Sequence, residues 1–352
     1  MPGLSGKIEM PKISVLMPIY KTNPEHLKKA IASVINQTFT DFEFLILDDC
    51  PVDQESERIV KSYQDKRISY RHNTKNMGIA NTHTALMQWA QSPYWAMMDH
   101  DDVMDKKRLE KQIAFMESHP NIGTCGTAYR RFGTWKKCGV IYPSEHSDDI
   151  KAELFFKCPM LHPSIMIRAD VAKKHHIFYN ANYISANDRR LYLDMMPYTD
   201  FHNLPEVLMN YRMHANMTSK TKRDAITAEQ KRLRAEILAN MRAELSTEEE
   251  QILNDFVLKG RCRIKDEGVL EQVANVLKKI DTANQKSGYF PRKSFAELCA
   301  KYLIKRCLNA AIYGRISSRT LLQQTTLPVD RAKKPLLLKM LNVMLPTPKG
   351  RN

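Results

Sequence analysis

One stretch constrains this chain more than any other: the apolar run from Tyr94 to Met98 leads directly into Asp99-His100-Asp101-Asp102. A short apolar run bounded by polar residues is typical of a strand that is buried on both faces. Acids that follow such a strand lie at the rim of a sheet, where open α/β folds bind ligands. Asp99 and Asp101 point to the same side of an extended segment, so they can share one Mg²⁺ or Mn²⁺ ion with substrate phosphates. An isolated acidic cluster is more often a solvated turn than a cation site. The rest of the sequence is needed to choose between these two interpretations.

Around this stretch the chain alternates between strand-like and helix-like segments. Apolar β-type runs occur at 13–17, 42–47 and 68–71, and helical spacing of apolar residues follows each of them. This alternation predicts a mostly parallel, Rossmann-like sheet with helices on both faces. The run at 42–47 ends in Asp48-Asp49, so both acidic groups are expected at one rim, in a crevice for a ligand that carries phosphate, ribose or sugar. The sequence has no Gly-x-Gly-x-x-Gly or Walker motif that would indicate a dinucleotide or P-loop site.

The second half of the chain is expected to change from sheet to helix. Further strands are predicted at 122–129, 162–168 and 208–214, whereas 130–150 shows no clear pattern. Beyond residue 221 the sequence is amphipathic and charged, with capping boxes at Ser246/Glu249 and Ser294/Glu297. The expected division is a loose leader (1–11), an α/β domain (12–220), an all-helical C-terminal domain (221–330) and a basic amphipathic tail (331–352).

Composition narrows the class of protein. The 352 residues carry a formal net charge of +15, which favours anionic partners. The charge is spread along the chain without interleaved aromatic residues, so no nucleic acid partner is expected. Seven scattered Cys without a metal-ligand spacing, and a start without an apolar core, predict a cytoplasmic protein. No apolar run approaches the roughly 20 residues that a membrane-spanning helix needs.

The tail contains six Lys or Arg and no Asp or Glu around an apolar segment from Pro335 to Leu345. A short basic helix of this kind can lie on an anionic bilayer, which would place the protein peripherally on the inner face of the cell membrane. It can equally pack against its own domain, and the sequence favours neither arrangement. The sequence also leaves open whether the chain forms a homo-oligomer.

Seven motifs, in order, resemble bacterial-type enzymes of glycosyltransferase family 2, which have the GT-A fold. The resemblance covers about residues 12–218, and the order and spacing of the motifs make it specific although each is short. The motifs are Ile13–Tyr20, Ser33–Phe39, Glu43–Asp49, Asn76–Asn81, Met98–Asp102, His162–Ser164 and Tyr211–His214. The resemblance implies that a sugar moves from a nucleotide-sugar, usually UDP-linked, to an acceptor with the help of Mn²⁺ or Mg²⁺. The expected acceptor is a glycan or lipid-linked glycan, as in the synthesis of lipopolysaccharide or capsule.

The resemblance also implies which residues bind the donor. Pro18 and Tyr20 lie in the loop that contacts the nucleotide base, and Asp49 accepts a hydrogen bond from the uracil. Asn76 and Gly78 belong to the same nucleotide-sugar-binding set.

The acidic segment matches the Asp-x-Asp motif of the family. The match implies that Asp99 faces the ribose or the metal, that Asp101 ligates the metal on the diphosphate, and that Asp102 shares this role. His214 lies in a segment that often contacts the diphosphate in relatives. The acceptor-side catalytic base of the family falls on Asp188.

The chain departs from the family pattern at two places. Cys50-Pro51 follows the acids of the second strand where relatives commonly have Gly-Ser, and the stiff Pro51 puts the nucleotide preference in doubt. Asn187 stands where relatives have Glu before the base, and Arg189 and Arg190 follow it. These arginines would lower the pKa of Asp188, bind an anionic acceptor group, or form a solvated face.

The expected chemistry follows from these parts. A carboxylate removes the proton of the acceptor hydroxyl, and a cation stabilises the charge that grows on the leaving diphosphate. One candidate base without an evident carboxylate nucleophile predicts direct displacement with inversion. The alternatives are a catalytically inactive nucleotide-sugar-binding subunit of the same fold, and a nucleotidyltransferase. The latter needs a Gly-rich basic loop where this chain has Pro18-Ile19-Tyr20-Lys21. His162 is expected to be structural.

Overall fold

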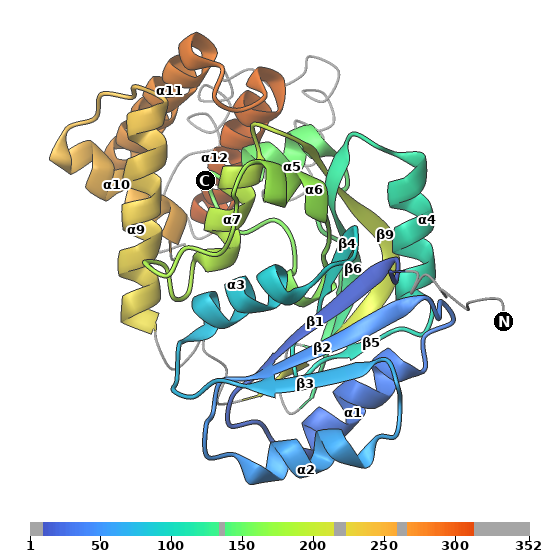
Figure 1. Cartoon of the computed structure of the whole chain (residues 1–352). Helices are drawn as coiled ribbons and strands as arrows, with labels where there is room; N and C mark the ends of the chain where they lie inside the picture. The colour runs from blue at the N-terminus through green and yellow to red at the C-terminus, as the bar shows by residue number, and fades with distance from the viewer. Residues whose placement is uncertain (1–9, 134–137, 215–222, 259–265, 313–352) are drawn as a thin grey trace, which may run out of the picture. The chain divides into compact units, whose positions relative to one another are not determined.

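The computed structural model describes residues 10–133, 138–214, 223–258 and 266–312 (Figure 1). Its contacts divide the chain into two compact units, of which the first contains residues 1–150 and 158–226 and the second 151–157 and 227–352. The expected tail and most of the expected leader lie outside the described residues. The four-part division expected from the sequence stays a prediction.

Within the described residues, the first unit is built on a nine-stranded mixed sheet with the order β3-β2-β1-β4-β8-β6-β9-β5, and β7 pairs with β6 beside this path. Its strands are β1 (Ile13–Ile19), β2 (Phe42–Asp48), β3 (Ile68–His72), β4 (Tyr94–Met97), β5 (Val103–Met104), β6 (Ile122–Gly133), β7 (Gly139–Ile141), β8 (Met166–Arg168) and β9 (Asp200–Met213). The four strands β3-β2-β1-β4 are parallel. β8 is antiparallel to both β4 and β6, whereas β6 and β9 are parallel. The α/β fold with a parallel first half is confirmed.

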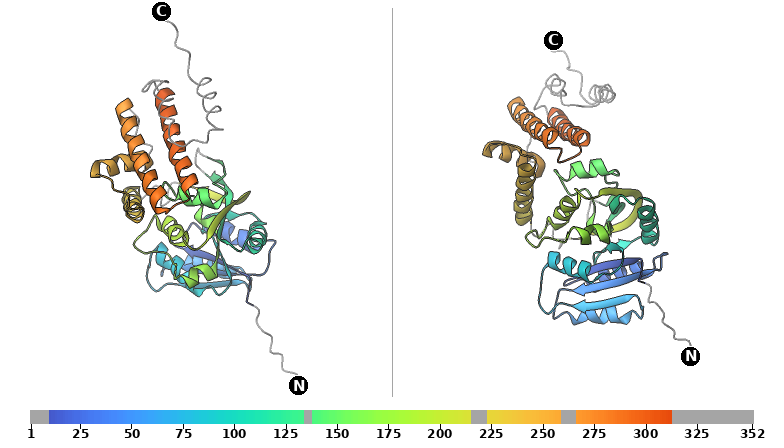
Figure 2. Two further views of the ribbon diagram at one scale, coloured as in Figure 1. Left: turned by 90° about the horizontal axis from the view of Figure 1, so that it is seen from above. Right: turned by 45° about the horizontal axis from the view of Figure 1, so that its top comes forward.

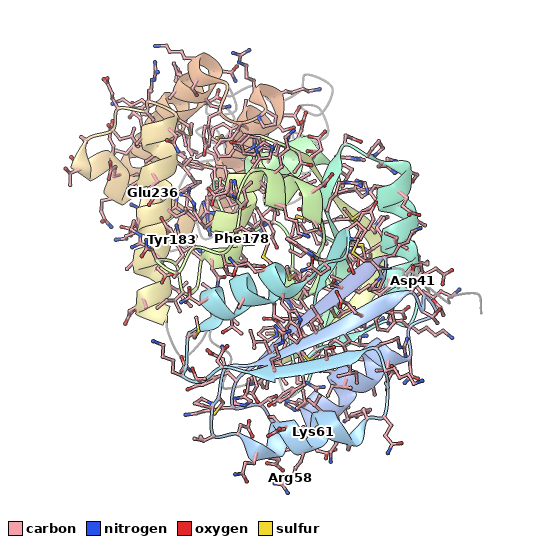
Figure 3. The ribbon with its side chains drawn as sticks, viewed as in Figure 1. Asp41, Arg58, Lys61, Phe178, Tyr183 and Glu236 are labelled. Carbon is pink, nitrogen blue, oxygen red and sulfur yellow. The ribbon has the colours of Figure 1, made fainter. Side chains whose placement is uncertain are left out.

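Helices cover both faces of the parallel strands, as the sequence predicts. α1 (Pro24–Ile35) and α2 (Gln54–Ser62) lie on one face and α3 (Ile79–Trp89) on the other (Figure 1). Figure 3 shows Arg58 and Lys61 on the outer side of α2, whose Ile59 and Val60 are buried. The remaining helical segments of the first unit are α4 (Arg108–Ser118), α5 (Ser147–Glu153), η1 (His162–Ser164), α6 (Ala169–Lys174) and α7 (Asn187–Met195).

The central strands explain why the site can be rigid. Every residue of β1 and of β4 is buried. α1 begins where the Asn23 side chain accepts the backbone N–H groups of Glu25 and His26 at 3.0 and 3.2 Å. Its apolar side chains then recur at helical spacing against the sheet. The polar loops that follow these buried strands are therefore anchored at their first residues.

Three local expectations are wrong. The segment 162–168 is not one strand, because Pro163 lacks the N–H that a sheet ladder needs; residues 162–164 form the 3₁₀ turn η1, and only Met166–Arg168 pairs as β8. The region 130–150 is partly regular, since it contains the end of β6 together with β7 and α5. Ser294 does not begin a helix, because α12 (Arg292–Ile312) starts before it and Phe295 N–H donates to Pro291 O.

The second unit consists of helices in its described part: α9 (Arg223–Asn240), α10 (Thr247–Leu258), α11 (Glu267–Ser287) and α12. The capping box before α10 is confirmed, since Ser246 and Glu249 exchange hydrogen bonds of 2.9 and 3.2 Å. α11 and α12 lie side by side in both views of Figure 2. Among the described residues, no helix combines the length and the apolar character that crossing a membrane requires.

Candidate active site

The parallel strands bring both acidic groups to one rim. β1 pairs in parallel with β2 on one side and with β4 on the other, so the residues after β2 and after β4 flank the end of β1. The loop after β1 contacts the acidic segment directly, because Thr22 Oγ1 lies 2.6 Å from His100 Nδ1. Asp49 and the segment Asp99 to Asp102 therefore lie at one rim of the sheet, as the strand order predicts.

The acidic segment folds into a compact group. One carboxylate oxygen each from Asp99, Asp101 and Asp102 lie within 4.8 Å of one another. Asp102 is fully buried, and burial followed by the charges of Asp101 and Asp99 raises its pKa well above the usual range. Negative charges this close repel one another unless a cation or a proton lies among them.

The end of β9 completes this group. The Arg212 backbone N–H donates to Asp102 Oδ1 at 2.7 Å, and the Arg212 Nε donates to the Asp101 carbonyl at 2.6 Å. His214 Nε2 lies 2.8 Å from Asp101 Oδ2. A strand more than a hundred residues downstream thus fixes the shape of the acidic loop. His214 lies at the acidic group itself.

The residues fit a divalent cation. Asp102 Oδ2 is buried and has no hydrogen-bond partner among the described residues, so this oxygen is available to a ligand such as a cation. Carboxylate oxygens suit Mg²⁺ and Mn²⁺, and an imidazole such as that of His214 is a ligand that Mn²⁺ accepts. The donor set would be Asp99, Asp101, Asp102 and His214.

Arg108 connects the strand before the acidic loop to the segment before β8. Its Nη2 donates to the carbonyls of Met97 and Ile165 at 2.9 and 3.0 Å, which joins the end of β4 to the start of β8. Arg108 is fully buried, and burial lowers its pKa to about 9 although Asp102 and Asp99 oppose the shift. Its charge therefore partly balances the acids from inside the protein.

A second cluster lies on the other side of Asp99. His162 Nδ1 is 3.7 Å from Asp99 Oδ1, and His162 Nε2 is 2.5 Å from the Tyr179 hydroxyl. His83 from α3 stacks on Tyr179 and meets His162 edge-on, with ring centroids 4.7 Å apart in both pairs. Burial would raise the pKa of Asp99, but His162 and its neighbours outweigh burial and lower the pKa. Burial lowers the pKa of His83 to about 3, so this ring is neutral at neutral pH.

Asp49 organises the loop on the opposite border. Its carboxylate accepts hydrogen bonds from Asn73 Nδ2 (2.8 Å) and from the backbone N–H groups of Met77 (2.7 Å) and Gly78 (2.8 Å). A carboxylate has about four acceptor positions, so about one remains for a ligand. Gly78 has φ +80° and ψ 157°, a conformation that is essentially restricted to glycine.

The other donor-side residues predicted from the sequence border the same rim. Pro18 is buried within β1, and Tyr20 directly after the strand is 44% exposed. Asn76 is exposed in the loop that Asp49 holds. Asp48 points into the protein, where it accepts from Cys50 N–H and from the Tyr70 hydroxyl, and burial raises its pKa to about 6.

Asp188 lies in the first turn of α7. Its Oδ2 accepts the Cys158 thiol at 3.3 Å, and its Oδ1 accepts the Arg189 backbone N–H at 2.6 Å. The arginines after it do not form a solvated face: Arg189 is fully buried, and Arg190 pairs with Asp194 one helical turn away.

The buried Tyr179 hydroxyl belongs to the second cluster. Burial raises its pKa well above the usual range, and the charges of Asp188 and of Asp99 add to this shift.

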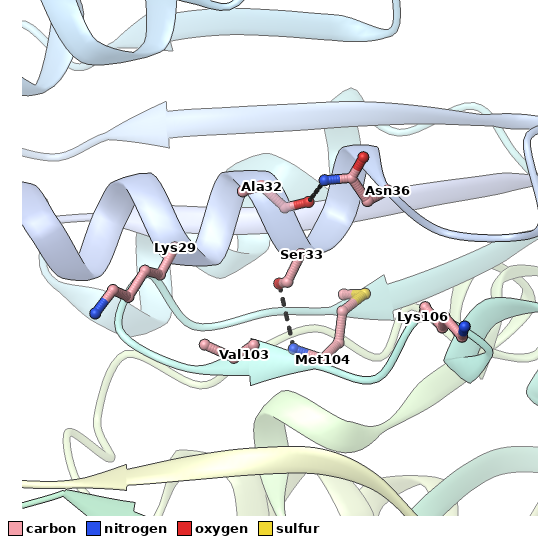
Figure 4. Close-up of a pocket in the computed structure, with 7 residues that line it drawn as sticks. All are labelled: Lys29, Ala32, Ser33, Asn36, Val103, Met104 and Lys106. Atoms are coloured by element: carbon pink, nitrogen blue, oxygen red, sulfur yellow. Dashed lines mark hydrogen bonds between the residues drawn. The ribbon is translucent and has the colours of Figure 1, made fainter.

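A shallow pocket elsewhere in the first unit lacks the chemistry of this site. It is lined by Lys29, Ala32, Ser33, Asn36, Val103, Met104 and Lys106 (Figure 4). Its lining residues include two lysines and no carboxylate, so it does not offer ligands for a cation.

Sequence reasoning missed several neighbours of the site. Arg212 was part of a recognised motif without a role, and His162 was expected to be structural although it approaches Asp99. Nothing local in the sequence singles out Tyr179, His83 or Cys158, because only the folded chain brings them to the site.

Comparison with known proteins shows the family of this chain. Residues 14–177 match the family described as Glycosyl transferase family 2. An uncharacterised glycosyltransferase of Methanocaldococcus jannaschii is 30% identical over 213 residues, which cover 59% of this chain and 73% of that protein. The chain belongs to glycosyltransferase family 2. Another relative, the amylovoran biosynthesis glycosyltransferase AmsE of Erwinia amylovora, is 28% identical over 215 residues, 59% of this chain and 78% of AmsE.

Solved structures support the GT-A fold of this glycosyltransferase. S. aureus TarS 1-349 in complex with UDP-GlcNAc superimposes with a TM-score of 0.57 at 16% identity, covering 86% of this chain and 92% of that one. The mannosyltransferase PcManGT from Pyrobaculum calidifontis, in complex with GDP-Man and Mn²⁺, gives a TM-score of 0.53 at 12% identity, with 96% and 87% covered.

Proposed function

We propose that this glycosyltransferase moves a sugar from a UDP-linked donor to a hydroxyl of a glycan or lipid-linked glycan, with inversion and with the help of Mn²⁺ or Mg²⁺. The observation that carries the proposal is the group of Asp99, Asp101 and Asp102 oxygens within 4.8 Å of one another. The Mn²⁺ in PcManGT and the link of AmsE to amylovoran biosynthesis support the cation and the glycan acceptor. TarS binds UDP-GlcNAc, whereas PcManGT binds GDP-Man, so the nucleotide needs a direct test.

In this mechanism the chain's own residues bind both ends of the donor. Asp49, with Asn76 and Gly78 in the loop it holds, forms the border that receives the base beside Pro18 and Tyr20. Asp99, Asp101, Asp102 and His214 would hold the cation, which when bound supplies positive charge to the leaving diphosphate.

Asp188 removes the proton of the acceptor hydroxyl. The Cys158 thiol donates to Asp188 Oδ2, which leaves the backbone-bonded Oδ1 and the remaining lone pairs to orient the acceptor. Asp188 is the one residue that the family resemblance assigns as base, and a single base without a carboxylate nucleophile is the arrangement of a direct displacement with inversion.

A panel of nucleotide-sugars with Mn²⁺ tests the proposal. A UDP-sugar should raise the melting temperature in the presence of Mn²⁺ and should be hydrolysed slowly to free UDP without acceptor. If a GDP-sugar raises the melting temperature more and is hydrolysed faster than any UDP-sugar, the donor nucleotide is GDP instead of UDP. If the wild-type chain binds the nucleotide-sugar but neither hydrolyses nor transfers it, the alternative holds: an inactive nucleotide-sugar-binding subunit. If Asp101→Ala and Asp188→Asn change neither binding nor turnover, these residues do not form the site. NMR of the product decides between inversion and retention.

A further inference from the structure

Two histidines and one carboxylate converge at the inner border of the rim. One ring nitrogen of His83, one of His162 and one Asp99 oxygen lie within 4.8 Å of one another. They come from three different elements: α3, η1 and the loop after β4. This group shares Asp99 with the acidic group but replaces its other oxygen ligands with imidazoles.

One member of this group has a buried ring nitrogen that the protein leaves unsatisfied. His83 is 2% exposed, and its Nδ1 is buried without a hydrogen-bond partner among the described residues. Buried polar atoms are nearly always paired, so an orphaned imidazole nitrogen suggests a missing partner. The distance of 3.7 Å between His162 Nδ1 and Asp99 Oδ1 is too long for a hydrogen bond. It is close to the separation of about 3.4 Å that two ligands of a tetrahedral zinc ion have when each bond is about 2.1 Å.

The surroundings resemble those of a metal-binding histidine. His162 Nε2 lies 2.5 Å from the Tyr179 hydroxyl. Outer partners of this kind orient a ligating ring and fix which nitrogen carries the proton. In the tautomer whose Nε2–H donates to Tyr179, His162 Nδ1 presents a lone pair toward the Asp99 carboxylate, and a cation between these two acceptors would satisfy both. The edge-on packing of His83 against His162, at 67°, directs both rings into one small space.

We propose that His83, His162 and Asp99 form a binding site for a transition-metal ion of the zinc class, separate from the acidic cation group. Two imidazoles with one carboxylate favour Zn²⁺ or Co²⁺, whereas the acidic group, with three carboxylates and one imidazole, favours Mg²⁺ or Mn²⁺. The site leaves a fourth position open. Because both groups use Asp99, an ion at the histidines withdraws this carboxylate from the acidic group. The binding claim does not depend on sugar transfer.

The test uses the full chain, freed of metal by a chelator, without any nucleotide. Calorimetry with Zn²⁺ should give one tight site per chain, and Co²⁺ should give the visible bands of a nitrogen-ligated, four- or five-coordinate ion. His83→Gln and His162→Gln should each weaken Zn²⁺ binding at least about tenfold, and Tyr179→Phe should weaken it by about 10-fold through the outer partner.

Controls separate this site from the acidic group. Asp101→Asn and His214→Gln should leave the Zn²⁺ affinity and the Co²⁺ bands unchanged. Should His83→Gln fail to fold, His162→Gln gives the same answer at a residue that is partly exposed. The proposal is overturned if Zn²⁺ does not bind, if both histidine variants bind it as wild type does, or if Asp101→Asn alone removes it; the cluster is then a hydrogen-bonded support for Asp99. Loss of UDP-sugar turnover with intact Zn²⁺ binding would count against the proposed function only.

Discussion

His214 Nε2 lies 2.8 Å from Asp101 Oδ2, so the end of β9 reaches the acidic loop that follows β4. If this pair holds the cation, His214→Gln should raise the Mn²⁺ concentration for half-maximal activity by about 10–100-fold. A Mn²⁺ titration at saturating donor measures the effect. The matched control is His26→Gln, whose ring lies 6.1 Å from that of His214. An unchanged Mn²⁺ requirement in His214→Gln would remove this residue from the site.

If Asp188 is the base, its substitution should change the rate of transfer rather than the affinity for the donor. Asp188→Asn keeps the shape of the side chain but cannot take a proton, so transfer should slow by about 10²–10⁴-fold while the donor binds as before. Asp194→Asn, in the same helix but paired with Arg190, should lose far less activity. Single-turnover rates and donor affinity, measured separately, check both. Equal losses of activity in the two variants would mean that both substitutions act by disturbing α7, and that Asp188 is not the base.

The thiol beside the base should be unreactive. Burial, followed by the charge of Asp188, raises the pKa of Cys158 well above its usual range, so the thiolate is scarce at pH 8. Cys138 is exposed. Iodoacetamide should therefore modify Cys138 at least about tenfold faster than Cys158, as followed by peptide mass spectrometry. In Asp188→Asn the difference should narrow.

Gly78 holds the loop beside Asp49. Its backbone, at φ +80° and ψ 157°, disfavours any side chain, although a Cβ at this position would meet no atom within 4 Å. Gly78→Ala should cost about 1–3 kcal/mol of unfolding free energy and weaken donor binding, because the N–H of Gly78 donates to Asp49. Gly268→Ala, in the first turn of α11 and without a positive φ, should change the unfolding free energy far less. Urea denaturation compares the two.

Asp48 should make stability depend on pH. Its pKa in the folded protein is about 6, raised chiefly by burial, against about 4 for an ordinary Asp. The folded state therefore binds this proton more tightly, and the resulting stabilisation is present below pH 4 and is lost as pH rises to about 6, by about 2 kcal/mol. Asp48→Asn should remove this part of the pH dependence. Denaturant unfolding at pH 4 and pH 7 measures the unfolding free energy of both proteins. The same change in free energy between the two pH values in wild type and in Asp48→Asn would contradict the prediction.

Local patterns were enough to predict the parallel half of the sheet. β1, β2 and β4 are short apolar runs that end near Pro or Asp, and α1 has an Asn-Pro start, so each carries its own signal. Parallel pairing then follows from strand–helix alternation, which places Asp49 and Asp99 on one rim.

The rest of the site depends on contacts that the sequence does not encode locally. β8 reverses direction after a 3₁₀ turn, and this reversal brings His162 to Asp99. The Asp49 carboxylate reaches a loop 24 to 29 positions later. Cys158 meets Asp188 only because the fold closes a 30-residue separation. Neither the hydrophobic periodicity nor the spacing of motifs in the sequence predicts such contacts.

The bonds from Arg212 to the acidic loop join positions 110 and 111 residues apart. On the ribosome, at about 5–20 residues per second, the emerging acidic loop waits about 5–20 s for the strand that shapes it. During this interval the nascent chain exposes clustered carboxylates without their arginine and histidine neighbours. Assembly of the acidic loop is thus a late event in biosynthesis, and a polypeptide released before Arg212 would contain the acids without the residue that shapes their loop.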